Sequence, residues 1–192
     1  GLACMCCCGL LFYRGWELIL VGIAVVLGVL AYSAGPYPLA YRGWGDICVL
    51  VFYGIVPVCF TYYVQTGEFS SSAFWLSLAI GFQSVNILMV NNYRDYEQDK
   101  TVGKRTSVVI FGRSFGRAMY LVNMILAYAF SFPVYLYRDW TSRFLFLFFF
   151  ILQLFTWQDF IRSQGVELNK VLEQTARNVF LFALLLSTFL FF

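Results

Sequence analysis

Two aspartates and two asparagines lie close together in the polar stretch "VNNYRDYEQDKTVGKRT", residues Val90–Thr106. If the apolar segment before it continues into this stretch as a helix, Asn91, Asp95 and Asp99 recur every four residues and share one face. Asn92 lies three residues before Asp95, beside the same face. Carboxylates about 6 Å apart repel each other unless a cation lies between them. Mg²⁺ is the natural candidate, because it takes oxygen ligands, often one or two carboxylates together with substrate phosphates.

Basic residues follow the acidic pair within one short, glycine-broken segment. They are Lys100, Lys104 and Arg105. Acids that hold a metal beside bases that hold an anion are what a complex of diphosphate with Mg²⁺ requires. In an apolar protein the natural substrate of such a site is a lipid diphosphate, whose tail lies among the helices. The alternative is a solvated turn of mixed charge, since such loops are ordinary beside membranes.

The elements that must position these residues are apolar helices. The chain has 192 residues, of which 61% are hydrophobic and 12% charged, and no water-soluble domain of this size covers so much apolar surface. A helix crosses a bilayer with about 20 mostly apolar residues. The sequence predicts an all-α transmembrane bundle with six full spans, at Trp16–Ser33, Asp46–Thr66, Ser70–Val90, Phe115–Tyr135, Ser142–Phe160 and Thr175–Phe192. A seventh apolar run, Leu2–Phe12, is too short to cross the bilayer.

The distribution of Lys and Arg predicts the orientation of the bundle. Consecutive loops between the predicted spans lie alternately on the two sides of the membrane. The loops on the same side as the polar stretch hold ten of the thirteen basic residues, and the loops on the opposite side hold three. Because cytoplasmic loops are enriched in Lys and Arg, we expect residues Val90–Thr106 on the cytoplasmic side. The chain opens on Gly1 inside an apolar run, so we expect a parent protein with a longer N-terminus. A signal peptide is the alternative, without a basic region or cleavage site to support it.

Three stretches resemble a known family. "NNYRDYEQDKTVGKRT" resembles the second aspartate-rich motif of the UbiA superfamily of intramembrane prenyltransferases, most like the 1,4-dihydroxy-2-naphthoate polyprenyltransferases of menaquinone synthesis. "YSAGPYPLAYRGWGD" (residues 32–46) resembles a second segment of that branch, and "LNKVLEQTARNVFLF" (residues 168–182) is a weaker third match. With the pattern of spans, these stretches place most of the chain at the family's spacing.

The resemblance implies a fold of nine transmembrane helices with two aspartate-rich motifs. The six spans then correspond to helices four to nine, the last two-thirds of that fold, and Leu2–Phe12 to the end of helix three. We therefore expect a single but incomplete prenyltransferase domain over residues 1–192, without the first two helices and the first aspartate-rich motif. Because that motif would face Asp95 and Asp99 across the diphosphate, we expect the 192 residues to be inactive alone.

The resemblance also implies a reaction. It joins a polyprenyl diphosphate to 1,4-dihydroxy-2-naphthoate with loss of carbon dioxide, giving demethylmenaquinone, in the bacterial plasma membrane. The implied cofactor is Mg²⁺, which neutralises the diphosphate so that the allylic C–O bond ionises. Asp95 and Asp99 are implied to be the catalytic, metal-holding residues, with Asn91 as a further ligand and Asn92 completing or orienting the metal's shell. The residues implied to bind diphosphate are Lys100, Lys104 and Arg105.

The second matching stretch supplies further candidates for substrate binding. They are Tyr32, Tyr37, Tyr41 and Arg42. Arg42 suits an anionic group, either the diphosphate or the naphthoate carboxylate, and aromatic faces stabilise a carbocation. Tyrosines are also common anchors at membrane interfaces, and this alternative stays open for each of them.

Other polar residues of the chain have simpler expected roles, and two other functions remain open. Gln83 and Asn86 lie inside the third span, where polar groups are costly unless paired, so an interhelical hydrogen bond is expected for Asn86 and a cavity-lining role is the alternative. Glu97 is expected on another, solvated face. The same superfamily with another aromatic acceptor, such as 4-hydroxybenzoate, remains open, as does a non-catalytic transporter or scaffold. No feature of the sequence predicts nucleic-acid binding.

Overall fold

The computed structural model describes residue 9 and residues 15–34, 36–136 and 138–191, and all regular structure in these ranges is helical. The predicted partial helix Leu2–Phe12 falls outside the described residues, apart from Gly9. The elements in chain order are α2 (Glu17–Ser33), η1 (Leu39–Tyr41), α3 (Gly45–Val49), η2 (Leu50–Ile55), α4 (Val56–Thr66), α5 (Ser71–Arg94), α6 (Tyr96–Thr101), α7 (Ser107–Phe111), α8 (Arg113–Leu136), α9 (Trp140–Arg162), η3 (Gly165–Glu167) and α10 (Leu168–Phe191). The all-α prediction is confirmed.

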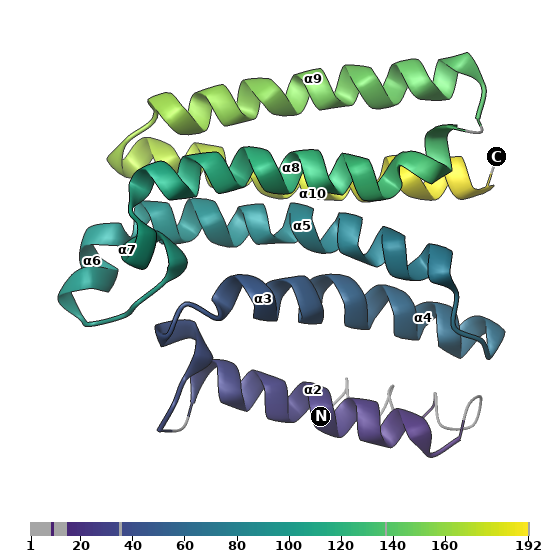
Figure 1. The fold of residues 1–192 in the computed structure, drawn as a ribbon, viewed down its shortest axis with the longest axis horizontal. Helices are drawn as coiled ribbons and strands as arrows, with labels where there is room; N and C mark the ends of the chain where they lie inside the picture. Colours follow the sequence, from purple (N-terminus) through teal and green to yellow (C-terminus); the bar gives the residue numbers. More distant parts are fainter. Residues whose placement is uncertain (1–8, 10–14, 35, 137, 192) are drawn as a thin grey trace.

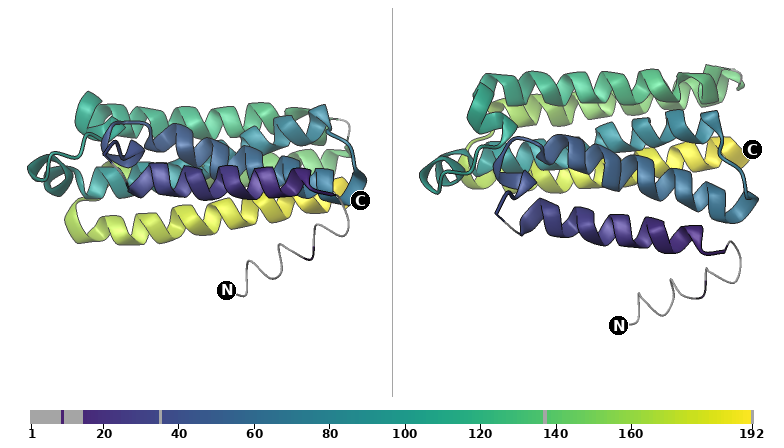
Figure 2. Two further views of the ribbon diagram at one scale, coloured as in Figure 1. Left: turned by 90° about the horizontal axis from the view of Figure 1, so that it is seen from below. Right: turned by 60° about the horizontal axis from the view of Figure 1, so that its bottom comes forward.

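The long helices run up and down beside one another, with α5 at the centre (Figure 1). On one side α5 packs against the continuous helix made of α3, η2 and α4, and on the other against α8 and α10. Figure 1 shows α2 along one outer edge of the bundle and α9 along the opposite edge. In Figure 1 α10 lies behind α8, and the left view of Figure 2 shows it as the yellow helix along the lower side of the bundle; it packs against α5, α8 and α9.

Four stretches of the described chain are long and apolar enough to cross a membrane. They are Gly45–Thr66, Ser71–Arg94, Arg113–Leu136 and Trp140–Arg162, and each matches one predicted span. The other two predicted spans are also helical, as α2 and α10. However, α2 has only 17 residues, and α10 begins at Leu168, earlier than predicted. That α2 and α10 cross the membrane stays a prediction.

The interior of the bundle is held by aromatic packing and by polar pairs between helices. Phe146 and Phe182 lie in one buried apolar cluster, and Phe160 lies in a second cluster nearer the polar stretch. Asn86 donates to the backbone carbonyl of Tyr120 (3.1 Å) and accepts from Asn123 (3.0 Å). The hydrogen bond expected for Asn86 is therefore confirmed, and it joins α5 to α8.

A close approach of two backbones fixes the position of η2 against α5. A Cβ atom on Gly54 would lie 2.5 Å from Gly81 Cα and 2.7 Å from the carbonyl oxygen of Ser77. Glycines at this contact let the two helices touch without side chains between them. Leu50–Ile55 is a π-helix, which is wider than an α-helix. Pro57, which cannot donate a backbone hydrogen bond, follows as the second residue of α4.

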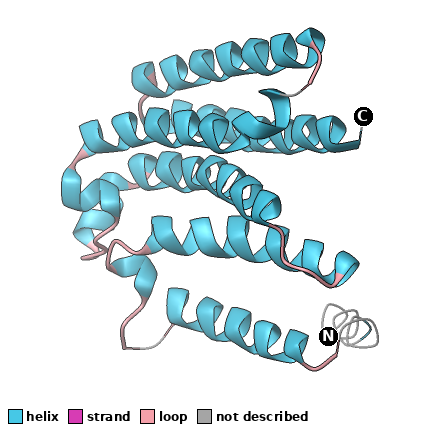
Figure 3. Ribbon diagram, turned by 45° about the vertical axis from the view of Figure 1, so that its right-hand side comes forward, coloured by secondary structure: helices cyan, strands magenta, loops and turns pink. Residues whose placement is uncertain are grey.

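The short elements gather at one end of the bundle, as Figure 3 shows. There α6 and α7 connect α5 to α8, and η1 connects α2 to α3. Thr106 caps α7 by accepting a hydrogen bond from the Val109 backbone N–H (3.3 Å). These connections carry the two polar stretches that the sequence singled out.

Candidate active site

The predicted motif helix is interrupted at its first acidic residue, Asp95. Helix α5 ends at Arg94, Asp95 has φ −89° and ψ 9°, and α6 begins at Tyr96. The prediction of an uninterrupted helix is wrong here. The four-residue spacing nevertheless survives in the backbone, because Asp95 N–H donates to the Asn91 carbonyl (3.0 Å) and Asp99 N–H to the Asp95 carbonyl (2.8 Å).

Asp95 is bound by the arginine that precedes it. Arg94 Nε lies 2.8 Å from Asp95 Oδ1, and Arg94 Nη2 lies 3.0 Å from Asp95 Oδ2. The same guanidinium donates to the side-chain oxygens of Asn91 (2.8 Å) and Asn169 (2.9 Å). Arg94 therefore ties the first half of the motif to the start of α10, where the third matching stretch begins. Both charged side chains are about a quarter exposed (28% and 26%).

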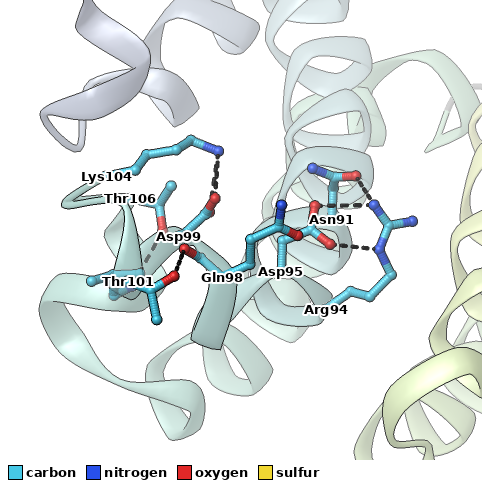
Figure 4. A network of polar contacts seen from close by, with 9 residues as sticks. Asn91, Arg94, Asp95, Gln98, Asp99, Thr101, Lys104 and Thr106 are labelled. Atoms are coloured by element: carbon cyan, nitrogen blue, oxygen red, sulfur yellow. Dashed lines mark hydrogen bonds and ion pairs between the residues drawn. The ribbon is translucent and has the colours of Figure 1, made fainter.

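Asp99 is bound by a different base. Lys104 Nζ lies 3.0 Å and 3.1 Å from the two Asp99 carboxylate oxygens, and the Lys104 backbone N–H donates to the Asp99 carbonyl (2.8 Å). Gly103, at φ +73°, makes the reversal that brings Lys104 back. Asp99 is buried, with 6% of its surface exposed. Figure 4 shows the Asp95 and Asp99 carboxylates turned toward these two different bases.

The second polar stretch docks onto the first. The Arg105 backbone N–H donates to the carbonyl of Tyr41 (3.0 Å). Gly43, at φ +80°, has no room for a side chain, because its Cβ would lie 2.8 Å from Ile110 Cδ1. Two segments that lie about sixty residues apart in sequence therefore form one cluster at the end of the bundle.

A cavity of about 430 Å³ lies beside this cluster, between α2, the α3–η2 helix and α5. Its lining is mostly apolar, with Tyr32 and Asn91 among its few polar members. Such a space suits an apolar ligand that carries a polar end. The lining residues are Gly28, Val29, Tyr32, Ser33, Cys48, Val49, Phe52, Tyr53, Ser84, Ile87, Leu88, Asn91 and Leu172.

A small polar recess of about 10 Å³ adjoins the cluster. It shares Tyr32 and Leu88 with the larger cavity, and the Tyr32 hydroxyl lies close to Gly45. Asn92 and Lys104 also line the recess. Its remaining lining residues are Ala40, Gly45, Asp46, Thr106 and Ser107.

The other predicted substrate-binding residues line neither of these two cavities. Arg42 stacks on the ring of Tyr37, with the guanidinium carbon 3.3 Å from the ring centroid. Tyr37 is 66% exposed and Tyr41 is 44% exposed. Lys100 and Arg105 are also exposed. The substrate-binding roles of all five residues stay predictions, and the stack holds the side chains of Arg42 and Tyr37 together on the exposed loop.

Two features of the cluster were not foreseen. Asp46 was taken only as the first residue of a span, and it lies in the polar recess. The sequence feature that could have indicated Asp46 is an acid directly before twenty mostly apolar residues that contain no basic partner for it. Arg94 is not among the predicted site residues, yet its guanidinium binds three side chains. Glu97 is exposed as expected, and lies 3.5 Å from Arg113.

The donor set fits a hard divalent cation. Asp95, Asp99, Asn91 and Asn92 offer carboxylate and amide oxygens, which Mg²⁺ prefers, and two carboxylates leave positions for substrate phosphate and water. No group of three or more His, Cys, Asp and Glu side chains suited to a metal occurs in the described part of the chain. A metal here would therefore depend on the substrate for its other ligands, and it would have to displace bases that now hold both acids.

The fold and the cluster define an all-α membrane bundle with acidic and basic groups grouped beside an apolar cavity. The chain matches the UbiA prenyltransferase family over residues 1–184, and it belongs to that family.

Individual relatives carry more specific names. A 1,4-dihydroxy-2-naphthoate octaprenyltransferase of Haemophilus influenzae is 36% identical over 107 residues, which are 56% of this chain and 35% of the relative. UbiA prenyltransferase domain-containing protein 1 of Gallus gallus is 33% identical over 129 residues, 65% of this chain and 38% of the relative. A 2-carboxy-1,4-naphthoquinone phytyltransferase of Synechocystis is 27% identical over 116 residues, 60% of this chain and 38% of the relative. The chain thus spans little more than a third of these curated relatives. No solved structure matches it significantly.

Proposed function

We propose that this chain forms the diphosphate-binding part of an enzyme that transfers a polyprenyl group to 1,4-dihydroxy-2-naphthoate, giving the reduced, quinol form of demethylmenaquinone. One observation carries the proposal: residues 32–46 and 91–106, the stretches that resemble the naphthoate branch of the family, meet in one cluster beside an apolar cavity. The names of several relatives, from Haemophilus influenzae to Bacillus subtilis, support the acceptor.

The proposed roles of the site residues follow from their charges. Asp95 and Asp99, with Asn91 and the neighbouring Asn92, would hold Mg²⁺, and the bound metal would supply Lewis-acid stabilisation of the diphosphate leaving group. Lys104 would bind the same diphosphate through charge-assisted hydrogen bonds. The substrate's prenyl chain would lie in the apolar cavity. Lys100 and Arg105, both exposed, would add long-range attraction for the polyanion.

The chemistry consists of one substitution at an allylic carbon. The allylic C–O bond breaks and its electron pair leaves with the diphosphate. An electron-rich ring carbon of the acceptor forms the new C–C bond, and the carboxyl group departs as carbon dioxide. Tyr32 lines both cavities, so its ring is the aromatic face best placed to stabilise the developing cation.

The proposed location is the bacterial plasma membrane, with the cluster on the cytoplasmic side. The bias of basic residues toward the loops around the cluster supports this orientation. The four candidate spans support insertion in a bilayer. A lipid diphosphate would then enter the cavity from the membrane, and the water-soluble acceptor from the cytoplasm.

The test is prenyl transfer in bacterial membranes, with labelled octaprenyl diphosphate and Mg²⁺. The chain is assayed alone and together with the N-terminal region of the Haemophilus influenzae relative, since we expect activity only in the second case. Product from 1,4-dihydroxy-2-naphthoate, and none from 4-hydroxybenzoate, is the expected result. Transfer to 4-hydroxybenzoate instead would overturn the proposed acceptor, and transfer to neither, in membranes where the relative itself is active, would overturn the proposed enzyme.

A further inference from the structure

A half-buried carboxyl group that the predicted site does not include lines the same recess as Lys104. It belongs to Asp46, in the first turn of α3. Its Oδ1 atom is buried and has no hydrogen-bond partner among the described residues. The Ser107 hydroxyl faces the same carboxyl group, but its oxygen also lacks a partner of full hydrogen-bond geometry. A carboxylate oxygen left unpaired in such a place is costly, so Asp46 is prepared for a partner that does not contact it in this state.

Lys104 is the basic residue in the lining of this recess. Lys104 and Asp46 line the same recess, whose volume of about 10 Å³ is that of one water molecule. The ammonium of Lys104 now binds both oxygens of Asp99, at 3.0 Å and 3.1 Å. A lysine carries its charge on a flexible four-carbon stem. The ammonium can therefore move between two carboxylates while its backbone stays in place.

The proposed function requires that movement. Asp99 cannot offer its oxygens to a metal while Lys104 occupies both of them. Once a divalent cation binds Asp99, the ammonium is repelled by the new charge and loses its partner. Lys104 is only 21% exposed at the side chain, so water compensates the lost ion pair poorly.

We propose that Asp46 is a positioning residue that receives Lys104 when Asp99 binds the metal. This inference rests on the proposed function of Asp99 as a metal ligand. Asp99 and Lys104 each keep a partner throughout the exchange. Before it, Lys104 pairs with Asp99. After it, Asp99 pairs with the metal and Lys104 pairs with Asp46. It also keeps the ammonium inside the recess, from which it can meet the diphosphate.

The first test measures metal affinity without prenyl substrate. Mn²⁺ is titrated into the detergent-purified chain and free Mn²⁺ is measured by electron paramagnetic resonance. Asp46→Asn is expected to weaken binding by about tenfold, a coupling within the range for members of one ion-pair network. In a Lys104→Met background the same substitution is expected to change affinity by less than about twofold. Glu97→Gln, which neutralises an exposed acid of the same segment, is the matched control and should change little.

The two backgrounds separate the exchange from simple charge attraction. If Asp46 acts only through its negative charge, its removal weakens Mn²⁺ binding equally with and without Lys104. That equality would overturn the exchange. Loss of the Asp99 carboxylate in Asp99→Asn should weaken binding strongly. If Asp99→Asn leaves Mn²⁺ affinity unchanged, the proposed metal site itself is wrong, so the two failures are distinguishable.

The second test follows the ammonium in the unaltered chain. An amine-reactive reagent labels accessible lysines, and mass spectrometry compares Lys104 with the exposed Lys100. Lys104 should stay protected both without Mn²⁺ and with it, because it passes from buried Asp99 to half-buried Asp46 and keeps an acidic partner. In Asp46→Asn, Mn²⁺ should make Lys104 as reactive as Lys100. Labelling of Lys104 on Mn²⁺ addition to the unaltered chain would overturn the proposal, whether or not the Asp46 variant folds.

Discussion

Gly54→Ala should destabilise the bundle, although it adds only one methyl group and raises helix propensity. The new Cβ would lie 2.5 Å from Gly81 Cα and 2.7 Å from the Ser77 carbonyl oxygen, where ordinary contact needs 3.4 Å or more. Both obstacles are backbone atoms, which cannot rotate away. The helices must therefore separate by about 1 Å along this contact.

The magnitude follows from a matched pair of glycines. Overpacking a close contact costs about 1–3 kcal/mol, and replacing a helical glycine by alanine returns about 1 kcal/mol. Gly22→Ala on α2 is the control, because a Cβ there meets nothing within 4 Å. The unfolding free energies of the two variants should differ by about 1–3 kcal/mol, with Gly54→Ala the less stable.

The assay is reversible unfolding in mixed detergent micelles, followed by far-ultraviolet circular dichroism. Each variant is compared with the unaltered chain at equal detergent composition, so that micelle effects cancel. If Gly54→Ala proves as stable as Gly22→Ala, the backbone contact between η2 and α5 does not hold the two helices together. The placement of the apolar cavity, which these helices line, would then lose its physical basis.

Three further variants test other parts of the structure. Asn123→Leu removes the donor of a 3.0 Å hydrogen bond between α8 and α5, and should lower the unfolding free energy by about 1–2 kcal/mol in the same assay. Thr106→Ala removes the cap of α7, and should speed hydrogen exchange of the Val109 amide, with a cost of about 1 kcal/mol. Tyr32→Ala truncates a ring that lines both cavities, and should raise the KM for one of the two substrates by about fivefold, the value of one aromatic contact. Tyr62→Ala, at an exposed tyrosine of α4 that lines neither cavity, is the control for that kinetic measurement.

Much of the fold could be predicted because the lipid environment leaves few alternatives. A segment of about 20 apolar residues must be a helix in a bilayer, since every backbone group must be bonded internally. Each of the six predicted spans is a helix for this reason. The interhelical role of Asn86 followed from the same physics, because an unpaired amide in lipid is costly.

The interruption at Asp95 could not be predicted from spacing. Polar residues at four-residue intervals are expected of a continuous helix. The same spacing also fits the observed chain, in which Asp95 leaves the helical range of dihedral angles but keeps its backbone hydrogen bonds. What decides the matter is Arg94, whose guanidinium binds Asp95, Asn91 and Asn169 at once. Asn169 lies 75 residues away in sequence, and no periodicity reports such a contact.

The recess was missed for a similar reason. Asp46 is the last residue of one stretch that the sequence singled out, and Ser107 directly follows the other, but neither has a spacing that marks it as part of a site. Their meeting depends on how the η1 connection folds over the end of α5, through the hydrogen bond from Arg105 to Tyr41. The resemblance to the family indicated residues 32–46 and 91–106 as the important stretches. Which of their side chains line the recess became clear only from the packing of the helices.

The most direct test of the central claim compares three carboxylates in one motif. Prenyl transfer to 1,4-dihydroxy-2-naphthoate is measured at saturating Mg²⁺, in membranes that also contain the N-terminal region of the relative. Asp95→Asn and Asp99→Asn should each reduce turnover by at least about 100-fold, because a neutral amide cannot offset the charge of the metal. Glu97→Gln should leave turnover nearly unchanged, since that side chain is exposed and bonded only to Arg113 at 3.5 Å among the described residues. Equal losses from all three variants, or full activity without either aspartate, would contradict the account.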